Sequence, residues 1–345
     1  ESGDGAGEGA QKRAKESFFA QIDDPFRSWL ASLDGNSDVE EKNREWIEAA
    51  RRIAKQVAGE LVASAPRSAI TGRDTGMTHI ATQQQLPLHG GPDAQGTPRW
   101  DFSTNSNAAG PCPHTLAALA QADARHYPDP AYTQLRAALA DWHGVAAARI
   151  VIGASGSELI ARITCWVALH NHAPHAPAKV WRPAHAYGDY AHAAQQYGLP
   201  LDDDVTQAKL IWLCAPSSPK GQALALPPGW TQRPAHSIVA LDCAYAPLQL
   251  SHTPIAPGLD RNSSWQIWTP NKALGLCGIR AAYAIAPAHA TVDDVQHLRA
   301  LAPSWPVGSH GVALLHSWCT PAVQAWLEQS RHTLRRWKQA QMALL

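Results

Sequence analysis

Residues 265–285, WQIWTPNKALGLCGIRAAYAI, place a single lysine between two apolar runs. The first run leads into Thr269 and Lys272, and a stretch of small residues then leads to Arg280 and the second run. Both runs predict buried strands, and burying an unpaired ammonium group between them is costly. One interpretation is a solvated lysine on a surface loop. The other is a reactive lysine in a partly apolar pocket, which can hold a carbonyl cofactor as a Schiff base while a nearby arginine grips a phosphate.

Length and charge set broad limits on function. The chain has 345 residues, enough for one large or two medium domains with a substantial core. Its 29 basic and 29 acidic residues give a formal net charge of zero, so charge does not favour binding to nucleic acid or to an anionic membrane. No apolar stretch reaches the roughly 18 residues that a membrane helix needs.

The cysteines and histidines do not indicate a metal site. The six cysteines are scattered, mostly in apolar runs, and form no CxxC pair. This pattern is typical of reduced, buried thiols in a cytoplasmic protein rather than of a disulfide framework or a zinc site. The 17 histidines show no convincing metal-ligand spacing, and we therefore expect no metal.

The first 76 residues differ from the rest of the chain. Residues 1–10 are rich in glycine, glutamate and alanine, which predicts disorder. Residues 11–33 and 38–64 show the apolar periodicity of amphipathic helices, and the turn-forming sequence DGNSD between them predicts a helical hairpin. The polar residues 65–76 predict a linker.

After this linker, apolar runs with the character of strands alternate with helical patterns. Such alternation predicts an α/β fold, a mostly parallel sheet with helices on both faces. The expected strands lie at 149–153, 178–182, 209–215, 237–242, 265–269 and 279–285, and helices are expected near 156–168 and 187–197.

The stretch around Lys272 resembles the cofactor-lysine motif of fold-type I pyridoxal-phosphate (PLP) enzymes, in particular the histidinol-phosphate aminotransferase group. That motif reads Thr/Ser-x-Ser/Thr-Lys and then, several residues on, Gly-x-Arg. Here Thr269, Lys272, Gly278 and Arg280 match it, and Asn271 replaces the usual hydroxyl residue. The resemblance implies PLP as cofactor, Lys272 as the catalytic residue that forms its aldimine, and Thr269 and Arg280 as cofactor-binding residues.

The segment GASGSE at residues 153–158 ends one predicted strand and opens a helix. Free backbone amides and the helix dipole at such a turn suit a phosphate, although the same turn also serves as a plain tight connection. The segment resembles the family's Gly-Asn-Gly-Ser-Asp-Glu phosphate cup. By this resemblance, Ser155 and Gly156 bind the phosphate of the cofactor.

The segment PAHAYGDY at residues 183–190 resembles the family's Pro-Thr-Tyr-x-x-Tyr motif with an insertion of two residues. This alignment implies that Tyr187 stacks on the cofactor ring and fixes its plane. A different placement of the insertion would give that role to His185. An ordinary start of an amphipathic helix is the structural alternative.

Two further segments follow predicted strands. APSSPKG at residues 215–221 resembles Pro-Asn-Asn-Pro-Thr-Gly, with Ser218 where the family has the asparagine that bonds the cofactor's 3′-oxygen. DCAY at residues 242–245 resembles Asp-Glu-Ala-Tyr, which implies that Asp242 pairs with the protonated ring nitrogen and that Tyr245 bonds the 3′-oxygen. An aspartate at this position could instead cap the next turn.

The resemblance also covers segments upstream. DFSTNSN at residues 101–107 resembles the family's substrate-side motif, which implies substrate contacts from Asn105 and Asn107. HYPDP at residues 126–130 resembles its Tyr-Pro-Asp motif, whose tyrosine reaches the cofactor phosphate of the neighbouring subunit. Tyr127 is therefore an expected cofactor-binding residue, and the chain an expected homodimer.

The HGG sequence at residues 89–91 resembles the start of threonine-phosphate decarboxylase of cobalamin synthesis, and it makes His89 a further candidate for substrate binding. Transamination and decarboxylation use the same cofactor contacts, so both reactions stay open. The expected substrate is an amino acid or an amino-phosphate.

The family continues into a small C-terminal domain with an arginine that clamps the substrate carboxylate, whereas this sequence stops within a predicted helix. We therefore expect three parts: residues 1–76, a PLP-binding large domain at 77–310, and the start of a truncated small domain at 311–345. The arginines of the last helix are expected to be solvated; they are Arg331, Arg335 and Arg336.

The predicted hairpin at residues 11–64 resembles the C-terminal helical region of the large subunit of type I-E CRISPR Cascade. An alternative to the PLP enzyme is therefore a catalytically impaired, truncated or fused protein with an N-terminal interaction hairpin. The six ordered motifs favour the enzyme, an aminotransferase of class I/II or a related amino-acid decarboxylase that acts through Lys272.

Overall fold

The computed structural model describes residues 103–170, 177–251 and 257–344, together with residues 92, 94, 96, 97 and 101. The chain divides into two compact units, residues 85–336 and residues 1–84 with 337–345. The sheet and the pockets belong to the unit of residues 85–336. The predicted hairpin at residues 11–64 and its linker lie outside the described residues, and the predicted domain boundaries stay predictions.

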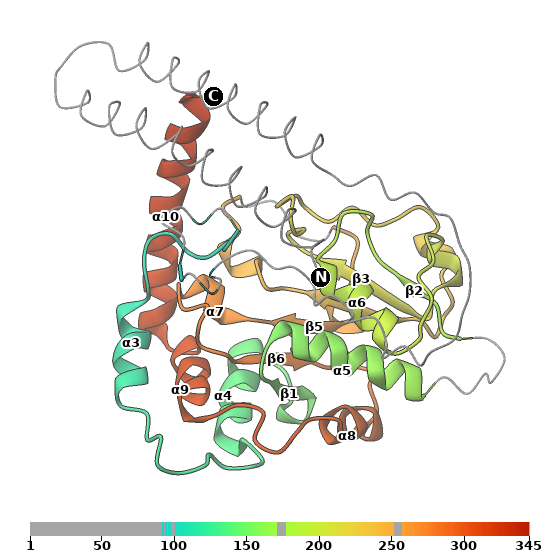
Figure 1. Cartoon of the computed structure of the whole chain (residues 1–345), viewed down its shortest axis with the longest axis horizontal. Helices are drawn as coiled ribbons and strands as arrows, with labels where there is room; N and C mark the ends of the chain where they lie inside the picture. The colour runs from blue at the N-terminus through green and yellow to red at the C-terminus, as the bar shows by residue number, and fades with distance from the viewer. Residues whose placement is uncertain are drawn as a thin grey trace, which may run out of the picture. The chain divides into compact units, whose positions relative to one another are not determined.

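The strands of the described residues form one sheet in the order β1-β6-β5-β4-β3-β2 (Figure 1). Strands β2, β3, β4 and β5 pair in parallel, whereas β6 runs antiparallel to both of its neighbours, β1 and β5. The predicted α/β fold with a mostly parallel sheet is confirmed. Each strand lies within its predicted range: β1 (Ile150–Gly153), β2 (Val180–Trp181), β3 (Leu210–Cys214), β4 (Ile238–Asp242), β5 (Trp265–Trp268) and β6 (Ala282–Ile285).

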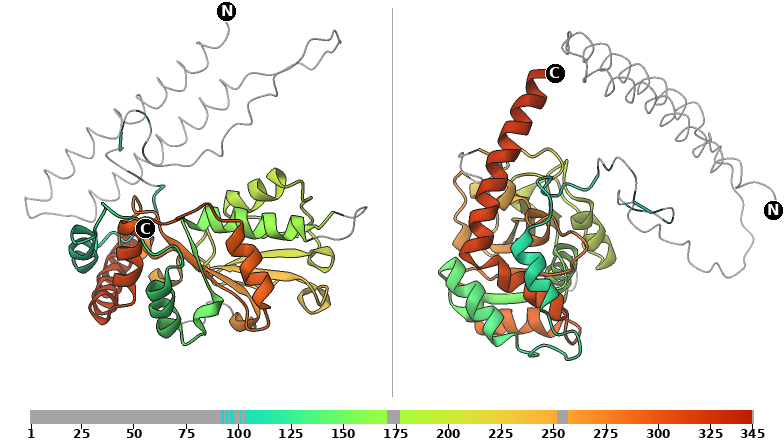
Figure 2. Two further views of the ribbon diagram at one scale, coloured as in Figure 1. Left: turned by 90° about the horizontal axis from the view of Figure 1, so that it is seen from below. Right: turned by 90° about the vertical axis from the view of Figure 1, so that its left-hand side faces the viewer.

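Helices cover both faces of this sheet, as Figures 1 and 2 show from three directions. Helices α5, α6 and α8 share a core with one face, and α3, α4, α9 and the start of α10 share a core with the other. Their bounds are α3 (Pro113–Ala120), α4 (Thr133–His143), α5 (Gly156–Leu169), α6 (Gly188–Gln196), α8 (Val292–Ala300), α9 (Ser309–Trp318) and α10 (Pro321–Leu344); a short helix, α7 (Pro270–Ala273), follows β5 directly.

The two cores arise from the alternation of side chains along each strand. In β1, Val151 faces α5 while Ile150 and Ile152 face α4. In the interior strand β6, Ala282 and Ala284 face α5, and these small side chains leave room for the helix. Apolar residues on both sides of each strand therefore explain why the sequence shows continuous apolar runs rather than a strict alternation.

His143, at the end of α4, is tied to the core through Tyr283 of β6. Trp318 Nε1–H donates to the Tyr283 hydroxyl. The Tyr283 hydroxyl in turn donates its proton to His143 Nε2, which lies 2.7 Å from the hydroxyl oxygen. Burial, and secondarily the charge of Arg261, lowers the pKa of His143 to about 4. The imidazole is therefore neutral in the folded protein at neutral pH.

We expect this neutral histidine to make the protein less stable in acid. Between pH 6.5 and 4 the unfolded chain binds a proton at residue 143 that the folded chain does not, so stability falls as the pH falls. Between pH 7 and pH 5, the free energy of unfolding of the His143→Gln variant should fall by about 2 kcal/mol less than that of the wild type. Urea unfolding at several pH values measures this difference. Parallel curves for the two proteins would show that His143 does not titrate differently in the folded state.

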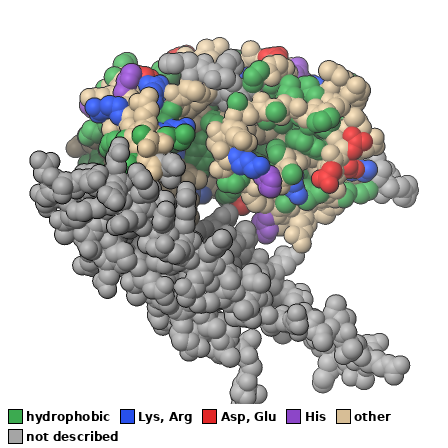
Figure 3. Space-filling view, turned by 90° about the horizontal axis from the view of Figure 1, so that it is seen from above, with side chains coloured by type: hydrophobic (Ala, Val, Ile, Leu, Met, Phe, Trp, Pro, Cys, Tyr) green, Lys and Arg blue, Asp and Glu red, His purple; other side chains and the backbone are tan. Residues whose placement is uncertain are grey.

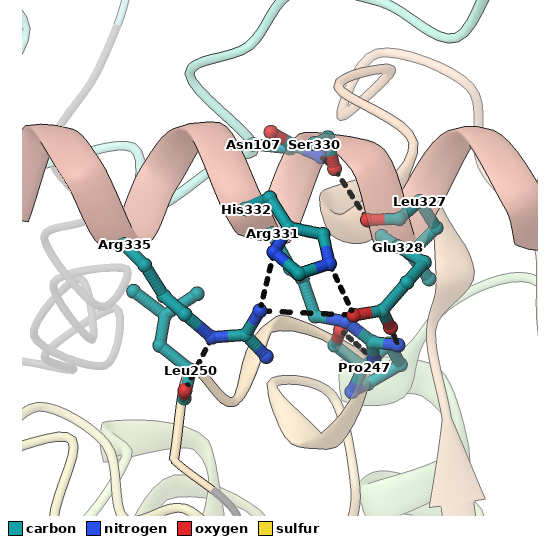
Figure 4. A network of polar contacts seen from close by, with 9 residues as sticks. All are labelled: Asn107, Pro247, Leu250, Leu327, Glu328, Ser330, Arg331, His332 and Arg335. Atoms are coloured by element: carbon teal, nitrogen blue, oxygen red, sulfur yellow. Dashed lines mark hydrogen bonds and ion pairs between the residues drawn. The ribbon is translucent and has the colours of Figure 1, made fainter.

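Helix α10 is fastened to the loop after β4 by two arginines, shown in Figure 4. Arg331 Nη1–H donates to Pro247 O at 3.2 Å, and Arg335 Nε–H donates to Leu250 O at 2.7 Å. Glu328 lies beside both guanidinium groups, and Arg331 in particular lowers its pKa. The prediction that these two arginines are solvated was wrong, because each satisfies a carbonyl of a neighbouring loop; of the three arginines, only Arg336 is exposed.

Asn107 connects α10 to the turn that carries Lys272, and Figure 4 shows Asn107 beside Ser330 of α10. Its side-chain nitrogen donates to Ala273 O and to Ser330 Oγ, both at 2.9 Å, and its side-chain oxygen accepts the Ala109 amide. Its own backbone amide donates to Lys272 O at 2.9 Å. Asn107 is thus a buried structural link with its hydrogen-bonding capacity largely used.

The hydropathy of the helices, the distribution of surface charge and the state of the cysteines are further features of the described residues. Among the described residues, no helix combines the length and the hydropathy of a membrane span. On the face shown in Figure 3, basic and acidic side chains lie in small separate groups rather than in one large patch of a single sign. All six cysteines are free, and three of them are buried: Cys112, Cys214 and Cys243.

Candidate active site

A pocket opens where the carboxyl ends of β1, β4 and β5 meet the beginning of β6. Because β6 is antiparallel to its neighbours, its first residues lie at the same edge of the sheet as the last residues of the others. All the predicted cofactor residues except Tyr127 line this pocket. The lining consists of Ser155, Gly156, Ser157, Ile160, Tyr187, Ser218, Asp242, Ala244, Tyr245, Thr269, Asn271, Lys272, Arg280 and Ala281.

Helix α5 begins at one wall of the pocket. Ser155 is its N-cap residue, and the Ser155 side chain accepts the Glu158 amide at 3.0 Å. The amides of Gly156 and Ser157 lie in the first turn, where a helix offers them no backbone partner. A side chain at residue 156 would begin only 3.0 Å from Thr269 Cγ2, so glycine keeps this wall open. Free amides and the positive end of the helix dipole favour an anion here.

Two further unpaired groups lie in the same pocket. Thr269 Oγ1 is buried and has no hydrogen-bond partner among the residues that the structure describes. Arg280 is exposed and, within that same part of the chain, makes no hydrogen bond or ion pair. A hydroxyl, a guanidinium group and a helix start that all lack such partners indicate a site for a phosphate-like anion.

Asp242 ends β4 and is a buried carboxylate in the pocket lining. It accepts the Tyr190 hydroxyl at 2.8 Å and the Ala244 amide at 2.9 Å. Burial raises its pKa, while these two hydrogen bonds and the charge of Lys272 oppose the rise. A buried carboxylate without a nearby cationic partner is costly, so Asp242 is suited to face a positive charge on a bound molecule.

The raised pKa of Asp242 predicts how the stability of the protein depends on pH when no molecule is bound in the pocket. Above the ordinary carboxyl value of 3.8, the folded state holds a proton on Asp242 that the unfolded state has released, so stability falls as the pH rises. The Asp242→Asn variant should lack this fall. Denaturant unfolding of both proteins at a series of pH values that starts near 3.8 and rises tests it, and a constant difference in unfolding free energy across the whole series would contradict it.

Lys272 lies on α7, and its Nζ is 5.5 Å from the centroid of the Tyr245 ring. It makes no ion pair with any described residue, although its charge acts on Asp242. Burial raises the pKa of Tyr245, and a hydrogen bond from the exposed Asn105 side chain opposes that rise. Of the predicted substrate residues, Asn105 is therefore in contact with a residue of the pocket lining.

Tyr187, rather than the alternative His185, lines the pocket. Its hydroxyl lies 3.2 Å from Ser157 Oγ, and burial raises its pKa to about 12, so it stays protonated at neutral pH. Its ring meets the Tyr190 ring edge-on at 5.9 Å. Ser218, in the loop after β3, completes this wall.

Two predicted site residues lie away from the pocket lining, and a third is not among the residues that the structure describes. Tyr127 is 78% exposed and stacks on Trp305, with ring centroids 4.5 Å apart, outside the pocket lining. Asn107 is buried in the link to α10 and does not line the pocket. His89 lies outside the described residues.

Sequence reasoning did not single out Tyr190. This side chain is fully buried, donates to Asp242 and stacks on Trp212, with the two ring planes 5° apart and the centroids 5.0 Å apart. It therefore sets the orientation of the Asp242 carboxylate. A signal was present, because Tyr190 occupies the second tyrosine position of the Pro-Thr-Tyr-x-x-Tyr pattern.

Comparison with known proteins gives matches to aminotransferases. The family model described as aminotransferase class I and II matches residues 98–342. An aromatic amino acid aminotransferase of Rhodococcus opacus is 31% identical over 215 residues, which cover 54% of this chain and 57% of that protein. A histidinol-phosphate aminotransferase of Roseiflexus castenholzii is 33% identical over 215 residues, which cover 53% of this chain and 54% of that protein.

Among solved structures, the fold is similar to that of histidinol-phosphate aminotransferase from Sinorhizobium meliloti, solved in complex with pyridoxal-5′-phosphate. The TM-score is 0.55 at 24% identity, and the match covers 67% of this chain and 66% of that one. The chain spans little more than half the length of the two curated relatives above. Because the family model matches most of the chain, the chain belongs to the class I and II aminotransferase family.

Proposed function

We propose that this chain binds pyridoxal 5′-phosphate in the candidate active site and catalyses amino-group transfer from an amino acid. PLP is the cofactor of the class I and II aminotransferase family. The observation that carries the proposal is the pocket itself, where residues from segments far apart in the sequence and similar to PLP motifs surround one cavity that contains Lys272.

The unpaired groups of the pocket fit the phosphate end of this cofactor. The first turn of α5, the orphaned Thr269 hydroxyl and the unpaired Arg280 all lie in its lining. These groups would hold the phosphate through amide, hydroxyl and charge-assisted hydrogen bonds. A bound dianion would satisfy the buried hydroxyl, for which the described part of the chain supplies no partner.

The buried carboxylate fits the ring end. Asp242 would hold a proton on the ring nitrogen, and that positive charge would reverse the effect of burial and keep the carboxylate ionised. Tyr190 fixes the direction of the carboxylate through its hydroxyl. Tyr187 would cover one side of the ring, and Tyr245 and Ser218 supply hydroxyl groups beside it.

Lys272 is the one amine among the described lining residues, and it has two tasks in this proposal. It would hold the aldehyde carbon of the cofactor through Nζ. It would also move a proton to and from the substrate's α-carbon once an amino acid has entered. When bound, the cofactor supplies an electron sink that stabilises negative charge at that α-carbon.

The relatives support a substrate with an aromatic or imidazole-containing side chain, because they are named aromatic amino acid and histidinol-phosphate aminotransferases. Decarboxylation of threonine phosphate is the competing reaction, since it uses the same cofactor contacts. The two reactions differ in which bond of the α-carbon lies perpendicular to the ring.

The test is product analysis with purified, PLP-loaded protein. We expect phenylalanine or histidinol phosphate, with 2-oxoglutarate present, to give glutamate in a reaction that needs Arg280. Release of carbon dioxide from threonine phosphate without glutamate formation would assign the decarboxylase reaction instead. Failure to bind PLP, seen as no change in the cofactor's absorbance spectrum when protein is added, would overturn the proposal as a whole.

We also propose that the protein works as a cytoplasmic homodimer. Tyr127 and Trp305 form an exposed aromatic pair, which is the kind of surface that a second subunit covers. Six free thiols suit a reducing compartment.

Light scattering should give twice the chain mass, and Tyr127→Ala should weaken PLP binding if the tyrosine reaches the partner's pocket. A monomer at micromolar concentration with full PLP affinity would contradict the proposed dimer.

A further inference from the structure

A second cavity, of about 430 Å³, lies beside α4 and α8, and it shares no lining residue with the candidate active site. We call it the arginine pocket. Its lining consists of Pro130, Ala131, Tyr132, Arg136, Ile152, Arg162, Arg299, Ala302, Pro303, Ser304, Trp305 and Pro306. Three arginines in one cavity of this size are unusual, because guanidinium groups repel one another and lose hydration on burial.

Two of the three arginines, Arg136 and Arg299, form no ion pair with any residue that the structure describes. Arg136 uses Nη2 to donate to Ala147 O at 2.8 Å, while its Nε is buried and finds no partner among the described residues. Arg299 uses Nη2 to donate to Ala148 O and Ile150 O, at 2.9 and 2.8 Å. Burial, and then repulsion from Arg136, lowers the pKa of Arg299 to about 10, so Arg299 remains charged at neutral pH. Burial also lowers the pKa of Arg136.

The nearby carboxylates, Glu158 and Asp129, make their hydrogen bonds to groups other than Arg136 and Arg299. Glu158 is bound to the third arginine, Arg162, through two hydrogen bonds. Asp129 attracts Arg136 through space, but its oxygens accept the amides of Ala131 and Thr133. Within the described residues, neither Arg136 nor Arg299 forms an ion pair, which leaves guanidinium donors available to the cavity.

The rest of the cavity wall is mostly apolar. Trp305 forms part of it in a left-handed backbone conformation with φ of 47°, which is strained for a residue with a side chain. The ring is held there by a hydrogen bond from Nε1–H to Pro128 O at 3.0 Å and by the stack on Tyr127. Prolines 130, 303 and 306 and Ile152 supply further apolar surface.

We propose that the arginine pocket is a second ligand site that binds a small molecule with a carboxylate or phosphate on an apolar body of about the size of an aromatic ring. Guanidinium groups are the side chains best suited to bind either oxyanion, and Arg136 and Arg299 both line the cavity. The volume leaves room for more than the oxyanion alone, and the tryptophan and prolines give the apolar body its contacts.

Isothermal titration calorimetry of the full chain tests this site, with one molar equivalent of PLP per chain to fill the candidate active site without an excess that could compete for the arginine pocket. The probes are 3-phenylpropionate, phenyl phosphate and the uncharged 3-phenylpropanol. We expect one or both anions to bind at least about tenfold more tightly than the alcohol, because charge-assisted hydrogen bonds are lost with the charge. The stronger of the two anions identifies the oxyanion that the site prefers.

Variants separate this pocket from the active site. Arg136→Gln and Arg299→Gln should each weaken anion binding about tenfold, whereas Arg280→Gln, in the active site, and Arg233→Gln, on another loop, should not change it. Trp305→Leu keeps both guanidinium groups and should weaken phenyl phosphate more than inorganic phosphate. This variant serves as an independent probe if the loss of a backbone bond from Arg299 disturbs folding.

Three results would overturn the proposed anion site. Binding lost in Arg280→Gln but kept in both arginine-pocket variants would place the probes in the active site. Equal affinity for the acids and the alcohol, or no heat with any probe at millimolar concentration, would show that the cavity is no anion site. Neither result would bear on PLP binding, which is measured separately by absorbance.

Discussion

Replacing Lys272 with alanine is expected to abolish covalent capture of the cofactor and to lower the rate of amino-group transfer by about three orders of magnitude or more. The reason is that no other described residue of the pocket lining carries an amine, so nothing there replaces Nζ either in holding the cofactor or in moving the α-proton. The direct measurement is intact mass after treatment with PLP and borohydride. The wild type should gain the mass of one reduced cofactor, and Lys272→Ala should gain none.

A matched control is Lys220→Ala. Lys220 is exposed in the loop after β3, close in sequence to Ser218, and does not line the pocket. That variant should keep both the mass adduct and the rate. An adduct that survives in Lys272→Ala and disappears in Lys220→Ala would move the reactive amine to the other loop, and the proposed function would need a different catalytic residue.

Replacing Gly275 with alanine is expected to destabilise the fold by about 3 kcal/mol and to disturb the turn that carries Lys272. Gly275 has a φ of 69°, and a Cβ atom there would lie 2.6 Å from Gly110 O, a backbone atom that cannot swing aside. The Gly275 amide donates to Lys272 O, so a shift of this turn displaces the lysine. Denaturant unfolding and PLP affinity should both show the loss.

Gly278, three residues further on, is the control for this substitution. A methyl group added there would meet no atom of the described residues within 4 Å, and the backbone angle is not left-handed. Gly278→Ala should therefore change stability by no more than about 0.5 kcal/mol. If the two variants unfold at the same denaturant concentration, the close approach of the turn to Gly110 does not constrain the protein.

The sequence allowed the strands and most of the pocket to be predicted because both depend on short, local patterns. The apolar run before Lys272, for example, ends as the strand Trp265–Trp268 and delivers the lysine to the edge of the sheet. The apolar runs that lead to Asp242 and Ser155 likewise form strands, β4 and β1, and bring these two residues to the pocket. Residues that follow buried parallel strands must meet at one edge, so their convergence follows from the topology.

What the sequence could not show depends on partners far along the chain. Asn107 looked like a substrate residue, but Ser330 of α10, 223 positions away, engages its amide. Arg331 looked solvated because no pattern in its helix indicates the Pro247 carbonyl that it meets. The arginine pocket likewise joins Arg136 and Arg299 from two helices, and no local motif links them.

The place of β6 in the sheet has a consequence for the synthesis of the protein. This strand lies between β1 and β5 yet comes last of the described strands in the sequence, so both neighbours expose an unpaired edge until Ala282–Ile285 has left the ribosome. Unpaired apolar edges recruit other chains, and nascent sheets of this kind are exposed to aggregation. A protein with this order of strands should therefore depend on chaperones that hold the growing chain, and stalled or shortened translation products that end before residue 282 should be the forms that aggregate.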